Sequence, residues 1–180
     1  MRLHEIDDIT PFDDDDIETA RSIGFWKMEQ QSRGKKLFTT IGNISIYVER
    51  WPLVDKFSKF FFVNGNNAVG HATLIKRTNF KLPIQTVVWT VSPIYLKRSE
   101  RGSGFGKSFY TSLLDHGLVL ASDDAQTIQS KKTWTYLASK YRVYLYNTDV
   151  DNYSSQNITD INIAYGKNRN HMVLIVIPNN

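Results

Sequence analysis

Cysteine is absent from the 180 residues of this chain. That absence excludes disulfide bonds, thiolate catalysis and cysteine-ligated zinc or iron–sulfur sites, and it is typical of an intracellular protein. No apolar run approaches the ~20 residues that a membrane-spanning helix needs, and the N-terminal segment MRLHEIDDITPFDDDD lacks the apolar core of a signal peptide. We therefore expect a soluble, cytoplasmic protein without a membrane partner.

Neither sign of charge is in large excess. The chain carries 22 Lys and Arg against 18 Asp and Glu, a net charge of +4, which permits binding to nucleic acid but does not require it. Hydrophobic residues make up 41% of the sequence, and 180 residues are enough for one substantial core. The expected organisation is a single domain over residues 1–180, with no internal repeat.

Four consecutive carboxylates, Asp13 to Asp16, precede apolar residues at helical spacing. Acids in a first helical turn complement the helix dipole, whereas adjacent helical residues point in different directions and cannot all reach one ion. The run therefore predicts the start of a helix that ends near Gly24, and we expect no metal site.

Strand-like periodicity follows from residue 35 onward. Residues 37–41 and 44–48 are rich in β-branched and aromatic side chains, and residues 57–63 and 69–75 flank an Asn-Gly-Asn-Asn turn at 64–67. This pattern predicts an antiparallel meander that leads into the middle of the chain. His71, in the second strand of that hairpin, is interpreted as a strand residue and not as a base.

Residues 86–117 run from a strand through a glycine loop into a helix. Residues 86–91 are all β-branched or aromatic, Pro93 cannot donate to a sheet, and apolar residues recur at helical spacing from about residue 106 to 116, with Gly117 as a cap. Glycines 102, 104 and 106 allow close backbone approach at the positive end of the helix, which suits a phosphate. The spacing fits neither the P-loop nor the dinucleotide-binding fingerprint.

A short buried strand at 118–122 after the helix makes a right-handed βαβ unit with a parallel strand pair. A second helix is expected at about 128–139, and closing strands at 142–146 and 171–177. Between these strands, residues 147–170 are polar and too many for a plain loop. We interpret them as an ordered insertion or a lid.

The glycine loop resembles the acyl-CoA-binding motif of the GNAT N-acetyltransferase superfamily, Arg/Gln-x-x-Gly-x-Gly/Ala, through Arg101, Gly104 and Gly106. Val91-Ser92-Pro93 resembles the Val-x-Pro with which the preceding strand of that family ends, although seven residues, 94–100, separate it from Arg101. The order of elements is similar over nearly the whole chain. The resemblance implies an α/β (α+β) fold with a mixed central sheet, antiparallel N-terminal strands and a splayed parallel pair, flanked by helices.

The resemblance also implies a cosubstrate and a reaction. Acetyl-CoA would be bound by the backbone of Val91 and by the loop residues Arg101, Gly102, Ser103, Gly104, Phe105, Gly106 and Lys107. An amine acceptor of unknown identity would attack the thioester directly, with Asp123 or Glu49 as general base. The alternative is that Asp123 or Asp124 only caps the next helix. The family's usual acid is a tyrosine in the second helix, but Trp134 stands in that place and Tyr136 would point to the other side of the helix.

Two other functions stay open. Loss of the tyrosine is compatible with a GNAT-fold binding or structural protein that has no turnover. The basic residues Lys97, Arg98, Lys131, Lys132, Lys140, Arg142, Lys167 and Arg169 are compatible with a GNAT-like enzyme that modifies nucleic acid, as in some phages, or with an ordinary solvated surface. The oligomeric state is not indicated by the sequence.

Overall fold

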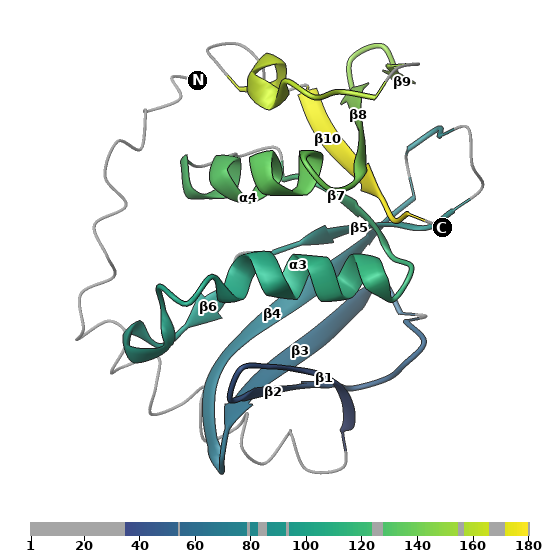
Figure 1. Ribbon diagram of the computed structural model, residues 1–180. Coiled ribbons are helices and arrows are strands. Elements are labelled where there is room, and N and C mark those ends of the chain that lie inside the picture. The colour runs from purple at the N-terminus through teal and green to yellow at the C-terminus, as the bar shows by residue number, and fades with distance from the viewer. Residues whose placement is uncertain are drawn as a thin grey trace, which may run out of the picture.

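The computed structural model describes residues 35–53, 55–78, 80–82, 86–92, 94–123, 128–154, 157–165 and 172–179 (Figure 1). The predicted acidic helix from Asp13 to Gly24 lies outside the described residues.

The N-terminal half of the sheet is an antiparallel meander. It consists of β1 (Lys36–Ile41), β2 (Ile44–Val48), β3 (Phe57–Asn64) and β4 (Asn67–Arg77), each paired with the next. Gly65 in the β3–β4 turn has a φ of +58°, the left-handed conformation that a tight hairpin turn requires. The Asn-Gly sequence therefore forms the hairpin that its composition predicts.

The middle of the sheet contains the parallel strand pair. β5 (Val88–Val91) pairs antiparallel with β4 and parallel with β7 (Val119–Ala121), and α3 (Phe105–Asp115) connects the two. This is the βαβ unit expected from the sequence, with each strand two residues shorter than the run predicted for it.

The residues between β5 and the glycine loop are not a free loop, because they continue to pair with β4. β6 (Tyr95–Leu96) pairs with Gly70 and His71, and the 3-10 helix η2 (Arg98–Glu100) follows it. The register gains one residue between the Leu74–Val91 pair and the His71–Tyr95 pair, so the line from β5 to β6 contains a β-bulge.

The C-terminal elements complete the sheet out of chain order. They are α4 (Ile128–Ala138), β8 (Arg142–Asn147), β9 (Asn152–Tyr153), the 3-10 helix η3 (Ile161–Ala164) and β10 (Met172–Ile177). β10 lies between β7 and β8, giving the order β1-β2-β3-β4-β5-β7-β10-β8-β9. Five of its six residues are buried, which is the environment that the run MVLIVI favours.

Helices α3 and α4 lie on one face of the sheet (Figure 1), and the main core fills the space beneath them. The insertion contributes to that core, because Ile161 and Ala164 of η3 are buried in it beside α4 and β10. The described part of the insertion therefore packs as an integral piece of the domain.

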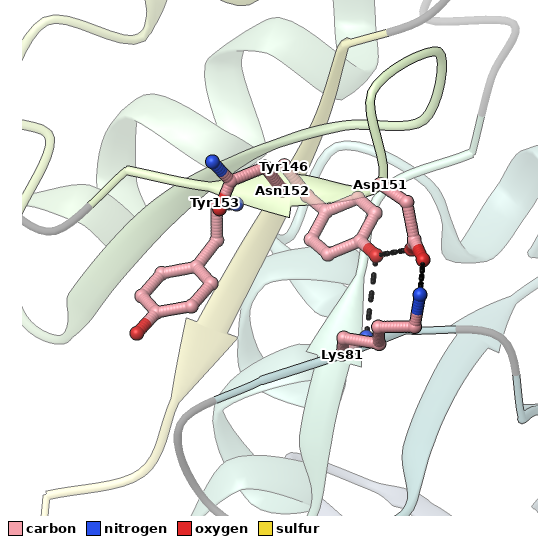
Figure 2. A network of polar contacts seen from close by, with 5 residues as sticks. All are labelled: Lys81, Tyr146, Asp151, Asn152 and Tyr153. Carbon is pink, nitrogen blue, oxygen red and sulfur yellow. Dashed lines mark hydrogen bonds and ion pairs between the residues drawn. The ribbon is translucent and has the colours of Figure 1, made fainter.

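The opposite face is covered by the segment that precedes β5. Phe80 and Leu82 pack on a second apolar cluster that includes Val88 and Tyr146. Polar contacts also hold this segment, as Figure 2 shows. The Lys81 backbone N–H donates to the Tyr146 hydroxyl at 3.2 Å, and that hydroxyl donates to the Asp151 carboxylate. The Lys81 ammonium forms an ion pair with the same carboxylate.

Candidate acyl-CoA site

The parallel strands separate at their carboxyl ends. Their pairing stops at Thr90 and Ala121, whereas Ser122, the residue after β7, continues the antiparallel ladder with β10. Its N–H donates to the Leu174 carbonyl at 2.8 Å, and its hydroxyl accepts from the Leu174 N–H at 3.0 Å. Val91 keeps its partner Leu74 on the β4 side only. A splayed edge of this kind exposes strand backbone to a ligand.

The glycine loop lies at the same end of the sheet, at the start of α3. Gly102 and Gly104 have φ values of +88° and +76°, which favour glycine over other residues, and Gly104 is the N-cap of α3. The cap provides no side-chain hydrogen bond, and the first turn contains no acidic residue. The N–H groups of that turn therefore have no side-chain acceptor, as an anion site requires.

Space is available over the loop as well. A Cβ placed at Gly102, Gly104 or Gly106 would meet no atom within 4 Å. Open space above backbone N–H groups at a helix N-terminus fits the pyrophosphate of coenzyme A. The residues present therefore suit this cosubstrate.

Three neighbouring side chains fix the loop. The Arg101 Nε donates to the Leu96 carbonyl at 2.7 Å, and Ser103 is hydrogen-bonded to the Glu100 carbonyl at 3.4 Å. Phe105 is 4% exposed and packs edge-on against Phe62 at 4.8 Å between ring centres. The loop is thus anchored on both sides, and Lys107 is left on the surface.

Asp123 follows β7 at the splayed edge and is exposed. Its charge reaches the phenol of Tyr110 on α3: burial raises the pKa of Tyr110 well above its ordinary value, with smaller contributions from Asp123 and Tyr165. Tyr110 packs edge-on against Trp134 of α4, at 6.1 Å between ring centres. Trp134 is 2% exposed, so a buried indole fills the position where the resemblance implied a tyrosine.

Tyr165, directly after η3, brings a second phenol to this region. Its hydroxyl is buried and forms no hydrogen bond of normal geometry; burial raises its pKa to about 12, which the nearby Ser130 hydroxyl partly offsets. The Lys131 ammonium lies 5.4 Å from the centre of its ring. Sequence reasoning missed both Tyr110 and Tyr165, because only tertiary packing brings α3, α4 and the insertion together.

Glu49 lies elsewhere. Each strand from β2 to β5 is antiparallel to the next, so the carboxyl end of β2 lies at the amino end of β5. Glu49 follows β2 directly and forms an exposed ion pair with Lys35 at 3.4 Å. The structure therefore brings Asp123, Val91 and the glycine loop to one end of the sheet and leaves Glu49 at the other.

Other candidate groups have structural partners. His71 stacks on Tyr95 at 4.9 Å, and burial, followed by the charge of Lys59, lowers its pKa. Within the described ranges, no group of three His, Asp or Glu residues is arranged to hold a metal ion. No helix in this part of the chain has the length and apolar character to cross a membrane.

No family model matches the sequence, and a search of curated proteins found no relative. Solved structures do show likeness. A GNAT family acetyltransferase from Elizabethkingia anophelis, with acetyl-CoA bound, is 11% identical with a TM-score of 0.42, over 77% of this chain and 100% of the other.

Two further structures are similar to the same degree. Diaminobutyrate acetyltransferase from Paenibacillus lautus, in complex with its substrate and coenzyme A, is 11% identical with a TM-score of 0.38, over 67% of this chain and 69% of the other. An acetyltransferase from Bacillus subtilis, in complex with CoA, is 13% identical with a TM-score of 0.39, over 69% and 78%. The antiparallel strands, the splayed pair β5–β7 and the glycine loop before α3 form the mixed α/β arrangement that the resemblance in sequence implied.

Proposed function

We propose that this protein is an acyl-CoA-dependent N-acyltransferase that transfers an acetyl group from acetyl-CoA to an amine. The observation that carries the proposal is the uncapped, open glycine loop at the start of α3, beside the splayed end of β5 and β7. Backbone N–H groups of the loop would bind the pyrophosphate, and Val91 would offer its backbone to the pantetheine arm. Arg101 would act mainly as a support, because its Nε already holds the Leu96 carbonyl.

In the reaction, the acceptor nitrogen attacks the thioester carbonyl carbon, the C–S bond breaks, and the nitrogen loses a proton while the sulfur gains one. Asp123 is the carboxylate at the splayed edge and is proposed to take the proton from nitrogen. A general base of this kind typically contributes ~10²–10⁴-fold to the rate. Direct attack needs no covalent nucleophile, in agreement with the lack of cysteine.

The leaving sulfur needs a hydrogen-bond donor, and Trp134 is a poor candidate because its indole N–H is not acidic. Tyr165 has a buried hydroxyl with a proton to donate and no acceptor of normal geometry. With a pKa of about 12, its phenol stays protonated throughout the neutral range. We therefore assign to Tyr165 the hydrogen bond to the departing thiolate, with solvent as the final proton source.

Calorimetric titration with coenzyme A tests the binding step. Gly104→Asn is the informative variant, because asparagine tolerates a left-handed backbone while its side chain fills the open space over the loop. We expect affinity to fall at least about tenfold, or about 1.4 kcal/mol. Gly106→Ala is the matched control, since the family motif accepts alanine there. Failure of the wild-type protein to bind coenzyme A at millimolar concentration would contradict the proposal.

A binding protein without turnover is the second candidate, favoured by the buried Trp134. Mass spectrometry after incubation with acetyl-CoA and mixed amines separates the two functions. Release of free CoA that depends on an acceptor eliminates the binding-only function, whereas tight CoA binding without any release supports it.

A further inference from the structure

A side-chain hydrogen bond ties the entrance of the glycine loop to the turn between β3 and β4. The Asn64 Nδ2 donates to the Glu100 Oε1 at 3.1 Å, in a partly buried contact between residues 36 positions apart. Glu100 is the last residue of η2, and Gly102 follows it two positions later. The contact therefore connects the N-terminal meander to the segment that enters the candidate acyl-CoA site.

The Asn64 end of this contact is firmly held. Asn64 is the last residue of β3, and it pairs with Ile44 of β2 on one side and with Asn67 of β4 on the other. Gly65 directly after it has the left-handed φ that keeps the hairpin turn tight. Because the backbone of Asn64 is paired on both sides, its amide is a fixed donor for the more exposed loop.

The Glu100 end is attached to the loop itself. The Glu100 carbonyl is hydrogen-bonded to the Ser103 hydroxyl at 3.4 Å. Residues 101–104 are exposed, so side-chain packing holds them only weakly. A shift of Glu100 would therefore be passed on to Gly102 and Gly104, whose left-handed backbone shapes the proposed anion site.

A carboxylate at this place has an electrostatic cost. The loop is proposed to hold a pyrophosphate, and a negative charge nearby disfavours a bound anion. The first turn of α3 contains no acidic residue, in contrast to the end of η2. A hydrogen bond to an ionised acceptor is about twice as strong as one between neutral groups. Glu100 therefore favours coenzyme A binding only if its bond to Asn64 fixes the loop strongly enough to outweigh the repulsion.

We propose that Asn64 and Glu100 are positioning residues that hold the glycine loop in its coenzyme A-binding conformation. The inference rests on the proposed function, because it concerns the loop that would bind the pyrophosphate. Neither side chain needs to contact the ligand. Without the hydrogen bond the loop populates other conformations, and the apparent Kd rises by the inverse of the competent fraction. A fall of that fraction to about one tenth weakens binding about tenfold.

Calorimetric titration of two charge-matched variants with coenzyme A isolates the hydrogen bond. Glu100→Gln and Glu100→Ala both remove the negative charge, but only glutamine keeps an acceptor for the Asn64 amide. We expect Glu100→Gln to bind coenzyme A at least as tightly as wild type. Glu100→Ala should bind about tenfold more weakly than Glu100→Gln. Equal affinity of these two variants would refute the inference.

Exchange of the two groups gives an independent test. Asn64→Asp places two carboxylates against each other and should weaken coenzyme A binding about tenfold or more. The double variant Asn64→Asp with Glu100→Gln restores a hydrogen bond with donor and acceptor exchanged, so its Kd should return to within about threefold of wild type. Asn66→Asp adds the same charge at an exposed position of the same turn. This matched control should leave the affinity unchanged.

The possible failures are distinguishable. Thermal unfolding of each variant separates positioning from stability: a contact that only stabilises the fold lowers Tm and leaves the Kd of the folded protein unchanged, and that result refutes the inference. A double variant that binds as weakly as Asn64→Asp refutes it too. In both cases wild-type protein still binds coenzyme A, so the proposed function stands. If wild-type protein does not bind coenzyme A, the proposed function fails together with the inference.

Discussion

Gly70 lies in β4 at the point where β6 pairs with that strand. We expect Gly70→Ala to destabilise the protein by about 3 kcal/mol. A Cβ at this position would lie 2.2 Å from the Tyr95 carbonyl oxygen, 2.9 Å from a ring carbon of Phe62 and 3.1 Å from the Leu96 Cα. Two of these contacts are with backbone, so β6 must move. We assign about 2 kcal/mol to overpacking and about 1 kcal/mol to the weakened hydrogen bond from the Lys97 N–H to the Val69 carbonyl, now 2.8 Å.

The same displacement should reach the glycine loop, because the Leu96 carbonyl holds Arg101. Gly70→Ala is therefore expected to weaken coenzyme A binding in addition to stability.

Urea denaturation followed by tryptophan fluorescence measures the stability, and calorimetry measures the binding. Gly106→Ala adds the same methyl group in open space within α3 and should instead stabilise by about 0.5–1 kcal/mol. If Gly70→Ala lowers the free energy of unfolding by less than about 1 kcal/mol and the variant binds coenzyme A normally, the inference that β6 packs closely on β4 at Gly70 is wrong.

Four other substitutions test separate parts of the structure. Tyr165→Phe should lower kcat about 10- to 100-fold with unchanged CoA affinity and with equal or higher stability, since it removes a buried hydroxyl that forms no hydrogen bond of normal geometry; loss of stability with kcat intact would contradict the donor role. Asp123→Asn should lower kcat in steady-state assays and leave the Kd for coenzyme A unchanged, whereas a lower Tm alone would identify a helix cap. Glu49→Gln should leave kcat unchanged, because the residue lies at the far end of the sheet. Tyr146→Phe should cost about 1–2 kcal/mol in thermal unfolding. The neighbouring lysine lowers the pKa of Asp151, so the stabilisation due to that carboxylate should be present above its ordinary pKa and disappear as the pH falls through the lowered value.

Local chemistry made much of the fold predictable. The Asn-Gly turn at 64–67 favours a hairpin because strand-like runs flank it, and three glycines before an amphipathic run favour a loop and a helix start. Residues 94–100 are different, because their pairing with β4 depends on Gly70, which is 25 positions upstream of Tyr95 and has no side chain to signal the contact.

Long-range placement was the part that the sequence could not supply. The apolar run of β10 predicts a central strand but does not say which strands flank it. The candidate site follows the same rule: the glycine loop has a local signature, whereas the convergence of Tyr110, Tyr165 and Trp134 requires knowing how the insertion packs against α4.

The position of β10 also has a consequence for synthesis. β10 follows β7 and β8 in the chain but lies between them in the sheet, so both neighbours leave the ribosome earlier. Until residues 172–177 emerge, the adjoining edges of β7 and β8 lack the strand that separates them, and unpaired apolar edges promote aggregation. The two hydrogen bonds between Ser122 and Leu174, at the carboxyl end of β7, also form only then. A nascent chain should therefore complete the candidate acyl-CoA site only after residues 172–177 emerge, when the N-terminal meander is already in place.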